Sequence, residues 1–137
     1  KRIINLANKI IKNTNKNSTI SFLGLSFKPN TDDIRESTSI KLANYLFEIG
    51  YLIKCFDPVA MNNAKKEYSN LIYCNSALEA CEDCEAIIIG TEWNEFRALN
   101  FSEISKIVKT KKVFDLRNIY NGEELENLGF TYYGTGK

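Results

Sequence analysis

The sequence predicts an α/β fold built on a mainly parallel sheet of six strands, and two observations carry this prediction. Six short apolar runs of strand-forming residues alternate with segments whose apolar residues recur every three or four positions. One run, residues 86–90 (AIIIG), is apolar throughout, as in a central parallel strand that is covered on both faces. The alternation therefore indicates a Rossmann-like, doubly wound sheet with helices on both faces, a three-layer αβα arrangement.

The first segment, residues 2–12, has the pattern of an amphipathic helix. Its apolar face holds Ile3, Ala7, Ile10 and Ile11. The polar run that follows, residues 13–18, is the only linker-like stretch of the chain. Because the chain also has no initiator Met, we expect a piece of a longer protein, in which residues 1–17 end the helix of a preceding domain and residues 18–137 form the sheet domain.

A βαβ unit comes next. Residues 19–24 have the composition of a strand, residues 37–49 that of a helix ended by Gly50, and residues 51–56 that of a second strand. Such a unit is right-handed and its two strands are parallel.

The same alternation continues along the chain. Helices are expected at residues 61–68, 76–84, 101–108 and 123–128. Strands are expected at residues 71–74, 86–90, 112–116 and 130–133. If the strand order is 3-2-1-4-5-6, strands 1 and 4 flank the point where the order reverses, and a ligand is expected there, at the carboxyl ends of the strands.

Charge and composition exclude several kinds of function. Lysine and arginine number 18 against 17 acidic residues, so no global field recruits nucleic acid or an anionic membrane. No apolar run is as long as a membrane span, and we expect a soluble, cytoplasmic protein. The chain has no histidine, which excludes a histidine base, a serine triad and most catalytic zinc sites within it.

The four cysteines do not indicate a metal or redox site. Cys81 and Cys84 have a C-x-x-C spacing, but they lie in an acidic, helix-like run without a second such pair. Cys55 and Cys74 fall on strand-like stretches, where small buried thiols are common. We expect all four to be reduced and inert.

The loop after the first strand, residues 24–37 (GLSFKPNTDDIRES), has the chemistry of an anion site. Lys28 offers a point charge, Arg35 a planar fork for a phosphate, and Ser37 starts a helix with free N–H groups. In an equally tenable interpretation, the loop is an ordinary polar connection whose acidic residues pair with its cations.

A dinucleotide site in this loop is disfavoured. Only Gly24 matches the G-x-G-x-x-G fingerprint, and Phe27 and Lys28 would obstruct the close approach of a pyrophosphate. Asp57 ends the second strand, where a ribose-binding acid would lie, but the Asp-Pro pair that it forms with Pro58 favours a turn.

Arg117 follows the fifth strand. With the expected strand order, Lys28, Arg35 and Arg117 are predicted to be neighbours around one pocket, and such a set of cations suits a diphosphate. Each of the three could instead be a surface charge that is paired with a nearby carboxylate. The carboxylates in question are Asp32, Glu36 and Asp115.

These residues also carry a family resemblance. Residues 24–37 closely resemble the signature of the C-terminal, UDP-binding domain of the UDP-glucose/GDP-mannose dehydrogenases. Further motifs of that family recur in the same order, namely residues 56–58 (FDP), 91–97 (TEWNEFR), 114–120 (FDLRNIY) and 133–136 (YGTG). The resemblance covers residues 19–137 and is greatest to the UDP-glucose 6-dehydrogenase branch, from which Leu116 departs because glycine is usual there.

The resemblance implies an NAD-dependent enzyme that oxidises C6 of UDP-glucose twice, to UDP-glucuronate, through a cysteine thioester. In this family the cysteine lies in a central helical domain and most of the NAD is held by an N-terminal domain, so this chain alone is expected to be inactive. The resemblance assigns UDP-sugar contacts to Phe27, Lys28 and Arg117, and an NAD contact to Arg35.

It further implies a homodimer or larger homo-oligomer, and a role in nucleotide-sugar metabolism and polysaccharide biosynthesis. The alternatives are the same domain of a UDP-N-acetylhexosamine or GDP-mannose dehydrogenase, or a nucleotide-binding module without catalysis.

Overall fold

The structure, a computed structural model, describes residues 2–134. Its strands are β1 (Thr19–Leu23), β2 (Leu52–Phe56), β3 (Ile72–Tyr73), β4 (Ala86–Ile89), β5 (Lys112–Asp115) and β6 (Thr131–Gly134). Its helices are α1 (Arg2–Lys12), α2 (Thr38–Glu48), α3 (Met61–Glu67), α4 (Ala77–Cys81), α5 (Asn94–Arg97), α6 (Phe101–Ile104) and α7 (Gly122–Asn127). Within the described residues, no helix is both long and apolar enough to cross a membrane.

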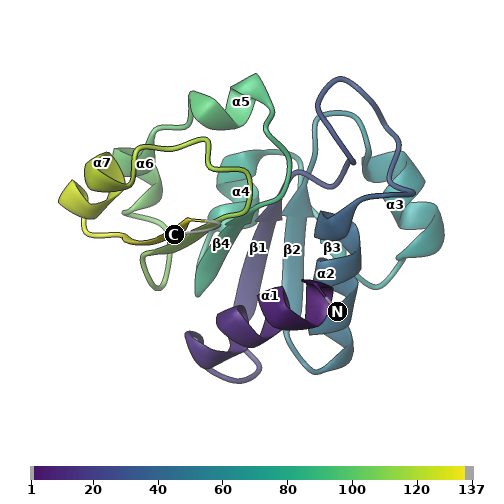
Figure 1. The fold of residues 1–137 in the computed structure, drawn as a ribbon, viewed down its shortest axis with the longest axis horizontal. Coiled ribbons are helices and arrows are strands. Elements are labelled where there is room, and N and C mark those ends of the chain that lie inside the picture. Colours follow the sequence, from purple (N-terminus) through teal and green to yellow (C-terminus); the bar gives the residue numbers. More distant parts are fainter. Residues whose placement is uncertain (1, 135–137) are drawn as a thin grey trace.

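The six strands form one sheet in the order β3-β2-β1-β4-β5-β6, and every pair of neighbours is parallel (Figure 1). The predicted α/β class is therefore confirmed, and the strands have the order on which the expected ligand position depends. The order reverses between β1 and β4, where Ile20 pairs with Ala86 and Leu23 with Ile89. A ligand site is expected at the carboxyl ends of these two strands.

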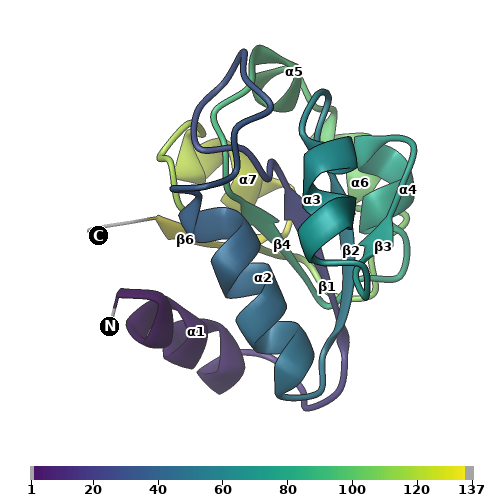
Figure 2. The same cartoon turned by 90° about the vertical axis from the view of Figure 1, so that its right-hand side faces the viewer.

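Helices cover both faces of the sheet, with α1 and α2 on one side and α4 and α6 on the other (Figure 2). The four residues of β4 are all fully buried because the strand contacts both layers. Ala86 and Ile88 belong to the apolar cluster under α1 and α2, whereas Ile87 and Ile89 belong to the cluster on the opposite face. The apolar run of β4 thus has the central position that its sequence predicts.

Helix α1 packs on the same core as α2. Ala7 and Ile10 of α1 are 0% and 1% exposed, and both belong to the cluster that contains Ile40 and Leu42 of α2. The assignment of residues 1–17 to a preceding domain stays a prediction.

Helix α2 begins and ends where its sequence predicts. The Ser37 side chain accepts a hydrogen bond from the Ile40 N–H at 3.3 Å, which satisfies one of the free donors at the start of the helix. At the other end Gly50 has φ +116°, a backbone conformation that would be strained for a residue with a side chain.

Helices α4 and α6 are several residues shorter than predicted and end at Cys81 and Ile104. The chain leaves α4 at Asp83, whose φ of +57° is left-handed and whose N–H donates to the Ile107 carbonyl at 2.8 Å. After Ile104 the helix gives way to tighter turns, in which the N–H groups of Lys106 and Ile107 donate to carbonyls three residues earlier. Helix α5 was not predicted, since its four residues are too few to show a periodic pattern.

Two glycines allow the loops after β1 and β4 to approach closely. A Cβ on Gly24, whose φ is +94°, would lie 2.6 Å from the backbone nitrogen of Thr91. A Cβ on Gly90 would lie 2.8 Å from the Gly24 carbonyl oxygen and closer still to the Ser39 hydroxyl. The switch point between β1 and β4 is therefore packed backbone against backbone.

We expect Gly90→Ala to lower the free energy of unfolding by about 1–3 kcal/mol, because the added methyl overpacks this contact. Urea unfolding measures the loss. In the double variant with Ser39→Ala the loss should be smaller than the sum of the single losses, since the hydroxyl that the methyl meets is gone. An alanine variant as stable as the wild type would contradict the packing described.

Candidate functional site

The turn after β2 is held by Asp57, which is fully buried. Its Oδ1 accepts the N–H groups of Val59 at 2.9 Å and Ala60 at 2.8 Å, across Pro58. This is the turn-opening role that the Asp-Pro pair predicts, and that interpretation is confirmed.

The other oxygen of Asp57 holds the loop after β1. Oδ2 accepts the N–H groups of Leu25 at 2.7 Å and Ser26 at 3.1 Å, and the Trp93 indole N–H at 3.4 Å. One buried carboxylate therefore joins the loops after β1, β2 and β4. Hydrogen bonds to a charged acceptor are among the stronger ones in proteins, so these three loops are fixed relative to one another.

Three hydroxyls extend this network along the first loop. Thr91 donates to the Ser26 carbonyl at 2.9 Å, Ser26 donates to the Lys28 carbonyl at 2.9 Å, and Ser39 donates to the Gly24 carbonyl at 2.6 Å. Thr91, Ser26 and Ser39 are all buried. Their hydrogen bonds fix the backbone on which Phe27 and Lys28 are carried.

A second buried carboxylate organises the loop after β5. Asp115 is fully buried and accepts the N–H groups of Arg117 at 3.2 Å and Tyr120 at 3.0 Å, and the Tyr132 hydroxyl at 2.8 Å. Partial burial and this hydrogen bond to Asp115 raise the pKa of Tyr132. Asp115 thereby sets the position of the Arg117 backbone.

The Arg117 guanidinium is held on one side by Glu92. Nε and Nη2 lie 2.9 Å and 2.7 Å from the same oxygen of Glu92, and Nη2 also donates to the Phe27 carbonyl at 3.2 Å. Partial burial raises the pKa of Glu92, but a backbone hydrogen bond and Arg117 lower it further than that, so its net shift is downward. The guanidinium is thus fixed by the loops after β1 and β4.

Arg117 lines a cavity of about 150 Å³ between the loop after β5 and the start of α2. Phe27, Leu116 and the first residues of α2, Ser37–Ser39, complete much of its wall. Glu92 does not line this cavity but lines a separate hollow beside α5, so it contacts the guanidinium from outside the cavity. A cation and the free N–H groups at the start of an 11-residue helix suit a phosphate.

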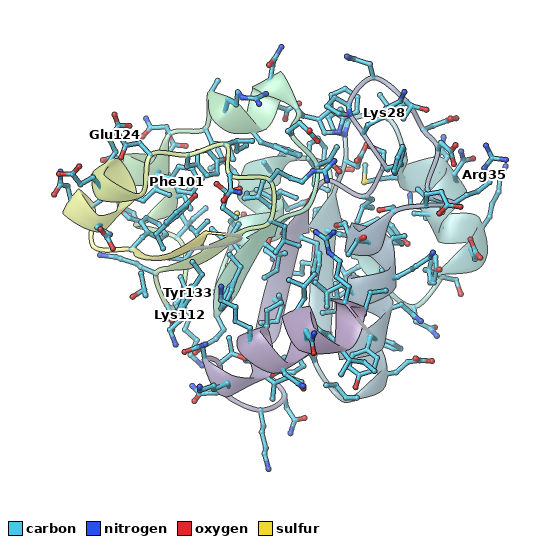
Figure 3. The ribbon with its side chains drawn as sticks, in the orientation of Figure 1. Lys28, Arg35, Phe101, Lys112, Glu124 and Tyr133 are labelled. Carbon is cyan, nitrogen blue, oxygen red and sulfur yellow. The ribbon has the colours of Figure 1, made fainter. Side chains whose placement is uncertain are left out.

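Arg35 does not share this cavity, and the prediction of one pocket for the three cations is wrong. Its side chain is 85% exposed and its Nε and Nη2 donate to the Asp33 carboxylate at 3.0 Å and 2.9 Å. It lines a wider hollow of about 600 Å³ beside α3, together with Lys66. Lys28 and Arg35 lie apart at the rim of the fold (Figure 3). The physical reason is that Arg35 pairs within its own loop, with the Asp33 carboxylate.

The predicted anion loop and the alternative of paired charges therefore each describe part of the loop. Arg35 is paired within the loop, as the alternative expects, whereas Phe27 and Arg117 line the cavity. Of the residues that carry this site, the sequence did not single out Glu92 as the partner of Arg117. The sequence did place Glu92 in the motif at residues 91–97, in the loop after β4, and that position was the available signal.

All four cysteines are buried free thiols. Burial raises the pKa of Cys55, which keeps the reactive thiolate scarce. Cys81 is the last residue of α4, Cys84 follows three residues later, and the Cys81 thiol is 3.8 Å from the Ser21 hydroxyl. Within residues 2–134, no group of three or more metal-binding side chains is present.

The structure is a Rossmann-like α/β domain, and the cavity that Arg117 lines lies at its switch point. The chain belongs to the UDP-glucose/GDP-mannose dehydrogenase family, whose UDP binding domain matches residues 21–122. Residues 24–37, 56–58, 91–97 and 114–120, which carry most of the resemblance, lie within the matched range, whereas residues 133–136 lie beyond it, and residues 135–136 lie outside the described structure.

Individual relatives agree with this family. The UDP-glucose 6-dehydrogenase of Rickettsia typhi is 45% identical over 123 residues, which are 88% of this chain and 28% of that protein. That of Rhizobium meliloti is 42% identical over 122 residues, 89% of this chain and 28% of that protein. The chain spans little more than a quarter of the relatives that it matches.

A solved UDP-glucose dehydrogenase has the same fold. The enzyme of the hyperthermophilic archaeon Pyrobaculum islandicum superposes with a TM-score of 0.72 at 28% identity, over 89% of this chain and 27% of that one.

The first prediction of the site concerns Asp57. We expect Asp57→Asn to cost about 2–3 kcal/mol of unfolding free energy, because an amide NH₂ would face backbone N–H groups that need an acceptor. Chemical denaturation measures it. Asp32→Asn removes an exposed carboxylate from the same loop and should be nearly neutral. Equal stabilities of the two variants would refute the role of Asp57.

The second prediction concerns Asp33. Hydrogen bonds from Arg35 lower the pKa of Asp33 from 3.8 to about 2. Since the folded-state pKa is depressed, the pair stabilises the fold above pH 3.8, and the contribution disappears as the pH falls toward 2. An NMR titration of the Asp33 carboxyl should show this midpoint and its return toward 3.8 in Arg35→Gln. An unchanged midpoint in that variant would mean that Arg35 is not the cause.

Proposed function

We propose that this chain is the UDP-sugar-binding domain of an NAD-dependent UDP-glucose 6-dehydrogenase, which converts UDP-glucose to UDP-glucuronate by two successive oxidations at C6. The observation that carries this proposal is the cavity in which Arg117 faces the start of α2. The identity of 42–45% to UDP-glucose 6-dehydrogenases supports the choice of substrate.

Within this proposal, Arg117 binds the diphosphate in the cavity, Lys28 reaches the diphosphate from the rim, and Phe27 contacts the sugar nucleotide. The Phe27 side chain is 46% exposed although it is large and apolar, which fits a ring that a ligand covers. The guanidinium is oriented before the ligand arrives, because Glu92 and the Phe27 carbonyl already hold it. Such preorganisation lowers the entropic cost of placing the substrate for reaction.

The residues of this chain do not fit a complete dinucleotide site of their own. Asp57, at the position of a ribose-binding acid, is fully buried and its oxygens accept from backbone N–H groups. We therefore assign most of the NAD, and the catalytic cysteine, to parts of the protein outside this chain. Arg35, highly exposed at the rim, is the residue proposed to reach the NAD.

The full-length protein is further proposed to be a cytoplasmic homo-oligomer that supplies a nucleotide sugar for polysaccharide biosynthesis. In it, residues 1–17 would end the helix of the central domain. Leu116 lines the cavity and is the residue on which a different sugar preference would depend.

We expect Lys28→Ala and Arg117→Ala each to weaken UDP binding by about ten- to a hundredfold, because each removes a charge-assisted phosphate contact. Isothermal titration with UDP, UDP-glucose, GDP and NAD measures this. The control Lys106→Ala removes a cation near α6 and should bind like the wild type.

Uridine-selective binding that both variants weaken would support the proposal. Equal affinity for UDP and GDP, together with a full-length protein that does not oxidise UDP-glucose, would overturn it.

A further inference from the structure

A second arginine lies on the cavity that contains Arg117. It is Arg2, the first residue of α1, and it comes from the opposite end of the chain. The cavity also contains one carboxylate, that of Glu36, so its two guanidinium groups leave an excess of positive charge. Neither of the ion pairs found in residues 2–134 involves Arg2.

The position of Arg2 follows from how α1 is fastened at its other end. The Lys112 ammonium, at the start of β5, donates to the Asn13 carbonyl, and the Asn15 amide donates to the buried carboxylate of Glu85 at 3.4 Å. The Thr14 and Tyr51 hydroxyls are 2.9 Å apart. The polar run after α1 is thus tied to the amino-terminal edge of the sheet and does not act as a loose linker.

Side-chain packing fixes the direction of the helix between these ties and Arg2. Ala7 and Ile10 are buried against the core, and the Lys9 ammonium lies 5.8 Å from the centre of the Tyr133 ring. Figure 2 shows α1 lying beside α2. Because the last turn of α1 and its buried face are both fixed in this way, the first turn of α1 lies near the start of α2, and Arg2 lines the same cavity as Ser37–Ser39.

We propose that Arg2 is a further ligand-binding residue, which holds the diphosphate of the bound nucleotide from the side opposite Arg117. The assignment of the ligand to a nucleoside diphosphate rests on the proposed function, whereas the placement of two arginines around one anion cavity does not. Through Arg2, α1 contributes to the lining of the ligand site in addition to packing on the sheet. Binding of the diphosphate then joins α1, α2 and the loop after β5 through one ligand.

The test uses inorganic pyrophosphate as the probe, titrated calorimetrically into the wild type, Arg2→Gln and Lys41→Gln. Lys41 is an exposed cation on α2 that does not line the cavity. Its variant removes one positive charge, as Arg2→Gln does, but away from the cavity. We expect about a tenfold weaker Kd for Arg2→Gln and less than a twofold change for Lys41→Gln. Thermal unfolding without ligand should be unaltered in both, since both side chains are exposed.

Amide exchange provides a second measurement that a structural role of Arg2 would not alter. Pyrophosphate should slow exchange in the first half of α1 in the wild type and in Lys41→Gln, but not in Arg2→Gln. A wild type that does not bind millimolar pyrophosphate, or equal Kd values for the two variants, would overturn the proposal.

Uridine selectivity separates this inference from the proposed function. If pyrophosphate binding depends on Arg2 while UDP and GDP bind equally well, the role of Arg2 stands and the proposed substrate fails. If UDP is preferred and Arg2→Gln binds like Lys41→Gln, the proposed function stands and the role of Arg2 fails.

Discussion

The buried carboxylate of Asp57 is the interaction on which the rest of the site depends. It lies at the end of β2 and accepts hydrogen bonds from the loops after β1 and β2 and from Trp93 in the loop after β4. A parallel sheet brings these loops to one edge but does not determine their paths. A charged acceptor without water must be satisfied by donors, so the three loops can close only in an arrangement that supplies them. Asp115 imposes the same constraint on the loop after β5.

This constraint explains why Arg117 lines the cavity and Arg35 does not. Arg117 follows Asp115 closely and is drawn toward Glu92 and the Phe27 carbonyl. Arg35 lies beyond the part of the first loop that Asp57 holds, pairs locally with Asp33 and remains at the rim. Arg117 is thus partly buried against this chain, whereas Arg35 is 85% exposed.

Much of the fold could be predicted from the sequence, and the exceptions have identifiable causes. Apolar periodicity was sufficient for the six strands and for six of the seven helices of residues 2–134, apart from the ends of α4 and α6, whereas the strand order entered only as a condition that the fold class suggested. After α4, the Asp83 N–H bonds the carbonyl of Ile107, which is distant in the sequence, and after α6 the chain continues in tighter turns. The motifs located Arg117 and Phe27 at the site, but the path of the first loop depends on a carboxylate 32 positions away from Leu25. Local pattern does not contain such information.

The central claim is that the ligand site lies between the start of α2 and Arg117, at the point where the strand order reverses. Amide NMR spectra of this chain, recorded during titration with UDP, test it most directly. The account predicts that the largest shifts fall at residues 26–28, 37–39 and 116–117, with smaller shifts around Arg35. Shifts confined to α3 and the hollow beside Arg35, or to the amino-terminal edge of the sheet, would contradict it.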